Sequence, residues 1–195
     1  PKDPASENFN MAASIVRTYL TERNFKTLAI CSAIPKEGKT TIACNVAVAM
    51  ARKGLRVVVV DADLRIPQIH EIFSISNGRG LSSLLKGEIE IENLDDALIQ
   101  TDLETLCVLP SGPVPEGPNT LLESQKMVDL VNTLRARFDV VVFDTPPITS
   151  VGSKFDSIRI APRNSGILEI CFSKCSNSSG ERGQPNPSSK ILLLR

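Results

Sequence analysis

The sequence predicts an α/β domain in three layers, with helices on both faces of a mainly parallel sheet. Four short apolar runs read as buried strands, 27–32, 56–63, 106–112 and 139–147, and the second of them is solidly β-branched. Three segments with helical apolar spacing alternate with them: 5–22, 41–53 and 120–138. Strands that alternate with helices form right-handed βαβ units, and these build a parallel sheet.

The first half of the chain supplies two of these helices and two of these strands. Apolar residues from Phe9 to Leu20 recur at three- and four-residue spacing, which indicates an amphipathic first helix. The first strand, TLAICS, ends in a loop, and the alanine-rich helix TIACNVAVAMARK follows that loop. Gly54 stops this helix just past a basic last turn. The run RVVVVDAD is then the second buried strand.

The second half begins with short elements, including an acidic stretch from Glu88 to Asp96 that is typical of a solvated face. The third strand, LCVLPSG, runs into a loop rich in proline and glycine. The helix TLLESQKMVDLVNTLRARF ends with Arg135 and Arg137 in its last turn, where cations complement the helix dipole. The fourth strand, DVVVFDTPP, completes the predicted sheet.

Composition limits the possible functions. Lys plus Arg and Asp plus Glu both number 22, so no charge excess points to a nucleic-acid partner. No apolar run approaches the roughly 20 residues that span a bilayer. The five cysteines are spread out and there is one histidine, so no zinc ligand set is visible. We expect reduced thiols in a cytoplasmic protein.

The loop after the first strand has the pattern of a phosphate-binding P-loop. The window AIPKEGKT ends in Gly38, Lys39 and Thr40, with Ala33 where the pattern GxxxxGK[ST] has its first glycine. Gly38 lets the backbone approach a phosphate, and the amides at the start of the next helix point at it. Lys39 would neutralise the β- and γ-phosphates, and Thr40 would offer its hydroxyl to Mg²⁺.

Carboxylates follow two other strands at the same edge of the predicted sheet. Asp61 and Asp63 end the second strand, with Arg65 close behind, and Asp144 ends the fourth. Ligands of parallel sheets lie outside the carboxyl ends of the strands. Asp144 after four apolar residues has the Walker B pattern, and Asp61 and Asp63 suit a magnesium shell or a base. The alternative is that these aspartates only cap turns.

Together, SAIPKEGKTT, VVVVDADLR and VVVFDTPP resemble the motifs of the bacterial tyrosine kinases of capsular and exopolysaccharide biosynthesis. The linking segments GLSSLLKGE and LPSGPVPEGPNTLLES resemble that family too. The resemblance covers about residues 5–152 and implies a MinD/ParA-like P-loop fold. It implies an ATP- and Mg²⁺-dependent autokinase that transfers the γ-phosphate to protein tyrosines and regulates polysaccharide polymerisation and export.

The resemblance also implies roles for individual residues. The expected catalytic residues are Lys39, Asp61, Asp63 and Asp144. The expected nucleotide contacts are Pro35, Lys36, Glu37, Gly38, Lys39, Thr40, Thr41 and Arg65. The expected magnesium ligands are Thr40, Asp61, Asp63 and Asp144. The implied partner is a membrane-bound polysaccharide co-polymerase or activator, separate or fused, which would place the domain at the inner face of the plasma membrane.

Two other functions remain open. Partition ATPases of the same superfamily carry a signature lysine five residues before the P-loop lysine, and here that position is Ile34. A second alternative is an ATP-binding assembly module without kinase activity. Two departures from the family favour this alternative. Only Arg17 is present of the family's ring-assembly pattern Glu-x-x-Arg-x-x-Arg, and there is no tyrosine-rich tail, since Tyr19 is the only tyrosine. A homo-oligomer is still expected.

The end of the chain departs from the family pattern. We expect one P-loop domain over 1–152 and a degenerate continuation of it over 153–172, in which Glu169 suits an edge strand. We expect a disordered or non-native tail over 173–195, because this segment is rich in serine, glycine, asparagine and proline. The sheet would then lack strands on one side and expose an edge.

Overall fold

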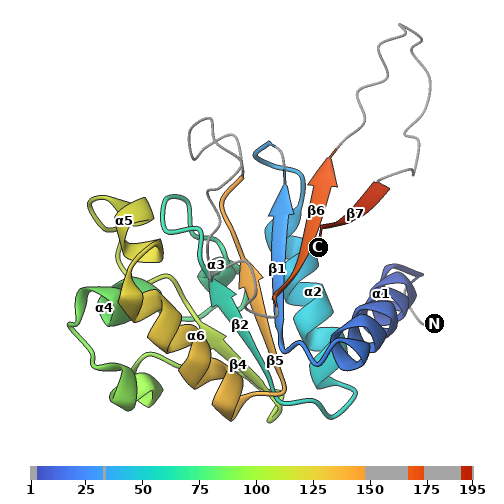
Figure 1. Cartoon of the computed structure of the whole chain (residues 1–195), viewed down its shortest axis with the longest axis horizontal. Helices are drawn as coiled ribbons and strands as arrows, with labels where there is room; N and C mark the ends of the chain where they lie inside the picture. Colours follow the sequence, from blue (N-terminus) through green and yellow to red (C-terminus); the bar gives the residue numbers. More distant parts are fainter. Residues whose placement is uncertain (1–3, 33, 148–166, 174–189, 195) are drawn as a thin grey trace, which may run out of the picture.

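The computed structural model describes residues 4–32, 34–147, 167–173 and 190–194 (Figure 1). In these segments seven strands form one sheet in the order β3-β4-β2-β5-β1-β6-β7. Their bounds are β1 Thr27–Ser32, β2 Val57–Asp61, β3 Ile99–Gln100, β4 Leu106–Leu109, β5 Val140–Asp144, β6 Ile167–Ser173 and β7 Lys190–Leu194. The five inner strands β4, β2, β5, β1 and β6 are parallel to one another. The edge strands β3 and β7 pair antiparallel with β4 and β6. The predicted mainly parallel sheet is confirmed.

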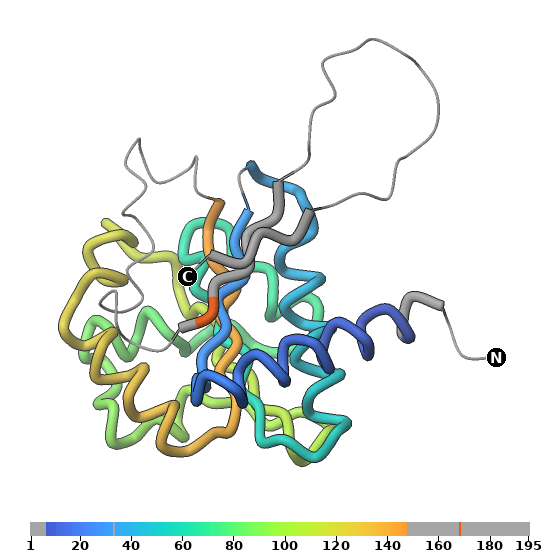
Figure 2. Tube along the Cα trace, turned by 45° about the vertical axis from the view of Figure 1, so that its right-hand side comes forward, coloured from blue at the N-terminus to red at the C-terminus, as the bar shows by residue number. Residues whose placement is uncertain are grey.

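Helices cover both faces of the sheet (Figure 1). Their bounds are α1 Pro4–Glu22, α2 Lys39–Ala51, α3 Ile69–Ile72, α4 Leu81–Lys86, the 3-10 helix η1 Ile91–Asp96, α5 Pro118–Leu122 and α6 Gln125–Arg137. Helices α1 and α2 pack on one face, and α4 and α6 on the other. In Figure 2 the N-terminal part of α1 extends away from the sheet.

Strand β2 shows why the central strands are apolar throughout. Val57 and Val59 belong to the core beneath α1 and α2, whereas Val58 and Val60 belong to the core beneath α4 and α6. All four are fully buried. Because successive side chains of a strand point to opposite faces, a strand covered on both sides needs an apolar residue at every position.

Residues 120–138, predicted as one helix, form parts of two. Helix α5 ends at Leu122, and α6 begins after Ser124. The Ser124 side chain accepts a hydrogen bond from the Met127 amide at 3.4 Å and caps the new helix. An N-cap residue has non-helical backbone angles, so the single-helix prediction is wrong at this position.

The C-terminal segments extend the sheet past β1, and the expectation that Glu169 lies on an edge strand is wrong because β7 pairs with the far side of its strand. Strand β6 lies between β1 and β7, with Leu168 buried against α1 and α2. Strand β7 lies inside the tail predicted as disordered or non-native, while 174–189 and 195 fall outside the described residues. The proposed division of the chain at 152 and 172 stays a prediction.

One expectation about the cysteines is wrong. Cys31 is disulfide-bonded, whereas Cys44 and Cys107 are free. The cysteine spacing along the chain gives no sign of a disulfide at Cys31, and reduced thiols were therefore expected throughout.

Candidate active site

The P-loop lies at the carboxyl edge of the sheet, between β1 and α2. Gly38 has φ +87°, in the left-handed region that favours glycine, and α2 begins at the next residue. Lys36 also has a positive φ, +64°. The Glu37 carboxylate accepts a hydrogen bond from the Ile34 amide at 3.3 Å and closes the loop on itself. These contacts and backbone angles shape the loop, and the first amides of α2 lie at its end.

Lys39 and Thr40 are buried, although both are polar and begin a helix. Each residue is 7% exposed. The Thr40 hydroxyl donates to the Gln68 side-chain oxygen at 3.4 Å, which links α2 to the loop after β2. The helix therefore holds an ammonium group and a hydroxyl against the end of the sheet, where the carboxylates of β2 and β5 lie.

Asp61 and Asp144 are neighbours because β2 and β5 pair in register at these two residues. Both are buried, with exposed fractions of 0% and 1%. Asp61 accepts backbone amides from Asp63, Gln68 and Ile69 at 3.3, 3.1 and 3.0 Å. Neither carboxylate oxygen of Asp144 has a hydrogen-bond partner in the described part of the chain. Two buried carboxylates thus lie side by side at the P-loop end of the sheet, one held by backbone amides and the other without a hydrogen bond from the described residues.

Burial sets the protonation of this pair. It raises the pKa of Asp61 to about 7, and the negative charges of Asp144 and Asp63 add to the rise while the Ile69 and Gln68 amides oppose it. Burial also raises the pKa of Asp144 to about 6, and this effect is opposed by the nearby Thr40 hydroxyl, whose hydrogen bond goes to Gln68 instead, and by the Lys39 charge. The site holds more carboxylate charge than the surrounding residues neutralise, and a cation would relieve this.

The chain is similar to known proteins in both sequence and structure. The AAA domain family matches residues 25–155. Tyrosine-protein kinase YwqD of Bacillus subtilis is 38% identical over 151 residues, which are 77% of this chain and 62% of YwqD. The solved structure of the chimerical protein CapA2B2 is 34% identical with a TM-score of 0.73, covering 88% of this chain and 73% of that one. This chain belongs to the bacterial tyrosine-protein kinase family.

The family shares its fold with MinD-type P-loop ATPases. The cell division ATPase MinD of Pyrococcus furiosus is 27% identical with a TM-score of 0.55, covering 68% of this chain and 53% of that one. The predicted MinD-like P-loop fold is confirmed. The chain spans 62% of the length of the kinase YwqD. None of the helices in the described segments is long and apolar enough to cross a membrane.

The remaining predicted site residues of this kinase-family chain fall into two groups. Asp63 accepts the amides of Arg65 and Ile66 at 3.3 and 3.2 Å and so shapes its own loop. Arg65 is exposed and donates to the Asn119 side chain at the start of α5 at 3.2 Å. The other group lines the P-loop or the first turn of α2 and is mostly exposed: Pro35, Lys36, Glu37, Gly38 and Thr41.

Three residues of this site were not foreseen. Gln68 holds the Thr40 hydroxyl, and the Thr145 hydroxyl donates to the Ile30 carbonyl at 2.9 Å beside Asp144. Cys44 lies one helical turn after Thr40, and burial followed by the charges of Asp144 and Asp61 raises the pKa of its thiol. The sequence signal for Thr145 was its place next to Asp144, whereas nothing in the sequence marks Gln68 as a neighbour of the P-loop.

Proposed function

We propose that this chain is the catalytic domain of an ATP-dependent protein-tyrosine kinase. The observation that carries the proposal is the meeting of Lys39 and Thr40 with two buried carboxylates at one end of the sheet. The unpartnered carboxylate of Asp144 in particular fits a nearby cation, because a buried charge without a partner is costly. The kinase motifs and the kinase relatives support the same activity.

The residues present fit magnesium-ATP. No group of three or more His, Cys, Asp or Glu side chains that could hold a metal lies in the segments described. This suits Mg²⁺, which proteins bind through one or two carboxylates while phosphates and water supply the other ligands. Asp144 and the Thr40 hydroxyl would hold it, with Asp63 or Asp61 reaching it through water. When bound, magnesium-ATP supplies the phosphoryl group and neutralises charge on the phosphates.

The chain's own residues then position the reactants and move a proton. The Lys39 ammonium and the first amides of α2 bind phosphate oxygens. A bond forms between the tyrosine oxygen and the γ-phosphorus, the bond from that phosphorus to the bridging oxygen breaks, and ADP leaves. The tyrosine proton passes to one of the aspartates at the carboxyl ends of β2 and β5.

The cellular setting belongs to the same proposal. The acceptors would be tyrosines of proteins that polymerise and export capsular or exopolysaccharide. A membrane-bound co-polymerase would activate the domain and hold it at the inner face of the plasma membrane, and further copies of the chain would assemble with it. The motif resemblance described above supports this setting.

Lys39→Met tests the proposal, with Lys86→Met as the control. Lys86 is an exposed lysine at the end of α4, and it forms an ion pair with Glu88 at 3.5 Å. Magnesium-ATP at one hundred times its Kd should stabilise the wild type and the control by about 2.7 kcal/mol in unfolding experiments. Lys39→Met should lose most of this effect, because it removes the charge that binds the phosphates.

Phosphate transfer is measured separately by mass spectrometry on an added tyrosine peptide. An added acceptor is needed because Tyr19, the only tyrosine, is half-buried and packs against the core of α1 and α2. Stabilisation without phosphotyrosine, even with an activator fragment present, would favour the nucleotide-binding assembly module. Equal stabilisation of wild type and Lys39→Met would refute the assigned P-loop.

A further inference from the structure

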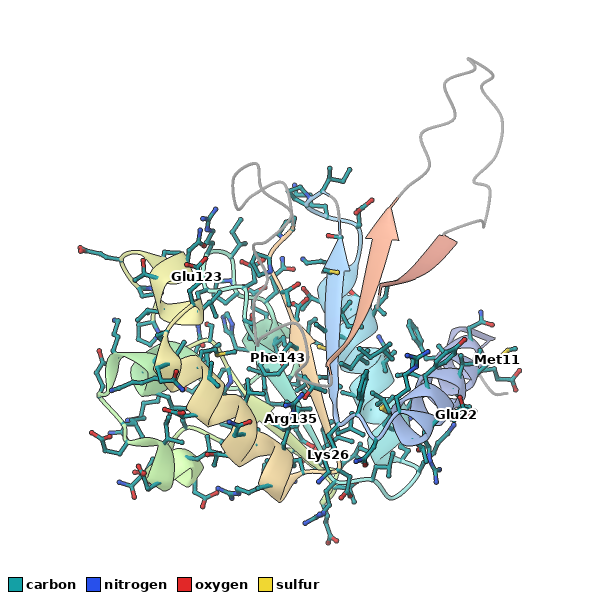
Figure 3. The ribbon with its side chains drawn as sticks, in the orientation of Figure 1. Met11, Glu22, Lys26, Glu123, Arg135 and Phe143 are labelled. Atoms are coloured by element: carbon teal, nitrogen blue, oxygen red, sulfur yellow. The ribbon has the colours of Figure 1, made fainter. Side chains whose placement is uncertain are left out.

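The carboxylate of Asp144 is held in place through its backbone. Neither of its oxygens has a hydrogen-bond partner in the described part of the chain. Phe143, labelled in the interior of the molecule in Figure 3, is fully buried in the core beneath α4 and α6, whereas Val142 belongs to the core beneath α1 and α2. Because successive side chains of a strand alternate between faces, Asp144 lies on the α2 side of the sheet. Its exact position then depends on how the end of β5 is fixed.

The end of β5 is hydrogen-bonded to a neighbouring strand on each side. On the β2 side the Asp144 carbonyl accepts the Ala62 amide at 2.8 Å. On the β1 side the Thr145 amide and the Thr145 hydroxyl both donate to the Ile30 carbonyl, at 3.3 and 2.9 Å. The hydroxyl makes the shorter of these two bonds, and Thr145 is 0% exposed. The Thr145 side chain is therefore part of the connection between β5 and β1.

The two residues that follow Thr145 cannot extend this connection. Pro146 and Pro147 have no amide hydrogen, so neither can donate to β1. Within the described segment 34–147, Thr145 is thus the last residue that can bond the end of β5 to β1 through an amide or a hydroxyl. Without its hydroxyl one donor would remain there, the Thr145 amide at 3.3 Å.

The same connection leads to the P-loop. Strand β1 ends at Ser32, and the Ser32 hydroxyl donates to the Ile34 carbonyl of the P-loop at 2.9 Å. Thr40 follows in the first turn of α2. The Thr145 hydroxyl therefore connects the strand that carries Asp144 with the strand that leads to Thr40, and these are the two residues expected to hold Mg²⁺ directly.

We propose that Thr145 is a positioning residue for a bound Mg²⁺. Its hydroxyl holds β5 against β1 and so sets the distance between the Asp144 carboxylate and the Thr40 hydroxyl. The inference rests on the proposed function, which places magnesium-ATP at these two groups. Mg²⁺ demands near-ideal octahedral geometry, so a shift of the Asp144 backbone weakens its binding. Hydrogen bonds that fix metal ligands from behind contribute to metal affinity in this way.

The effect of Mg²⁺ on ADP binding measures this positioning without any phosphate transfer. The magnesium enhancement is the Kd for ADP in EDTA divided by the Kd for ADP in excess Mg²⁺, each from isothermal titration calorimetry. In the wild type it should be about thirtyfold, within the range for coupled ligands. Thr145→Val should reduce it to about threefold, since residues that orient a metal ligand typically contribute about tenfold to metal affinity. The Kd in EDTA should stay unchanged, because Lys39 and the first amides of α2 bind phosphate without the metal.

Three variants separate positioning from stability. Thr145→Ser keeps the hydroxyl and should restore the enhancement, and Thr145→Cys supplies a weak donor and should give an intermediate value. Thr105→Val is the matched control, because the Thr105 hydroxyl donates to the Ala51 carbonyl at 2.9 Å near the start of β2, at the opposite edge of the sheet. It removes a hydrogen bond of the same kind and length, so it should lower the urea midpoint while leaving the enhancement unchanged.

The path through Asp144 is tested in the Asp144→Asn background. Asp144→Asn should itself lose most of the enhancement, because it removes a charged ligand of the metal. Adding Thr145→Val should then lower the urea midpoint but reduce the enhancement no further, because the hydroxyl acts only through the carboxylate.

Each outcome decides one point. A wild type that does not bind ADP, or whose ADP affinity Mg²⁺ leaves unchanged, would refute the proposed function together with the cation site that Thr145 positions. With the wild-type enhancement intact, an equal enhancement in Thr145→Val would overturn the positioning role alone. An equal loss in Thr105→Val, or a further loss in the Asp144→Asn background, would also overturn it. If Thr145→Val does not unfold cooperatively, Thr145→Cys takes its place, and a wild-type enhancement there would overturn the role.

Discussion

Asp144→Asn removes one buried negative charge while nearly keeping the shape of the side chain. Asp144 is 1% exposed, and burial raises its pKa from the ordinary 3.8 to about 6. Because the pKa of Asp144 is higher in the folded state than in the unfolded state, protonation of this carboxyl favours folding. The free energy of unfolding is therefore highest below about pH 4 and falls as the pH rises toward 6. Above pH 6 the ionised carboxylate costs a constant amount of stability. The asparagine variant has no such loss.

The size of the effect follows from the pKa difference. About two pKa units correspond to roughly 3 kcal/mol between acid pH and pH 8. Over the accessible range from pH 5 to pH 8 the wild type should lose roughly 1.4 kcal/mol relative to Asp144→Asn. Removing the Asp144 charge should also lower the pKa of Asp61, which that charge raises. Asp61 then loses less stability between pH 5 and pH 8 in the variant, so the measured difference should be at least about 1.4 kcal/mol.

Urea unfolding of the ligand-free protein at pH 5 and pH 8 measures the difference. Asp139→Asn is a matched control, because hydrogen bonds from Arg56 lower the pKa of Asp139. Asp139 therefore stays ionised in both states from pH 5 to pH 8, and its variant should differ from the wild type by the same amount at both. A constant gap between wild type and Asp144→Asn across this range would refute the argument that Asp144 is a strained buried charge.

Two further substitutions test the scaffold. Gly80→Ala should destabilise by about 2 kcal/mol in urea unfolding, because the added Cβ would overlap the Pro110 carbonyl oxygen of the loop after β4. A loss below about 0.5 kcal/mol would mean that the loop yields easily. Ser124→Ala should cost about 1 kcal/mol by removing the side-chain cap on the Met127 amide, and restoration by Asp at the same position would separate capping from packing.

Much of this architecture could be predicted from short-range patterns. Uninterrupted runs such as the valines from 57 to 60 identify strands covered on both faces, and the spacing of Gly38 and Lys39 after a strand identifies a P-loop. These patterns lie within single elements, where sequence neighbours are also spatial neighbours. The split at Ser124 was missed because apolar spacing continues across it, although serine followed by a helix is a capping signal.

The features that could not be predicted depend on register between distant segments. The bond from Thr40 to Gln68 requires α2 and the loop after β2 to meet, and neither residue type indicates this. The pairing of β6 with β1 depends likewise on strands far apart in the sequence. Apolar composition alone is weak evidence for a strand such as β7, since its stability comes from the partner strand.

The register between β2 and β5 explains why the charged site lowers the stability of the fold. Parallel pairing of β2 with β5 sets Asp61 opposite Asp144, so two strands that each end in a carboxylate bring like charges together in a buried place. Backbone amides offset part of this cost at Asp61, yet neither oxygen of Asp144 has a partner in the segments described. Substitutions that neutralise Asp144 should relieve that cost, so stability does not explain why an aspartate stands at this position. A role in holding a cation explains both the missing hydrogen bonds and the position beside Lys39 and Thr40.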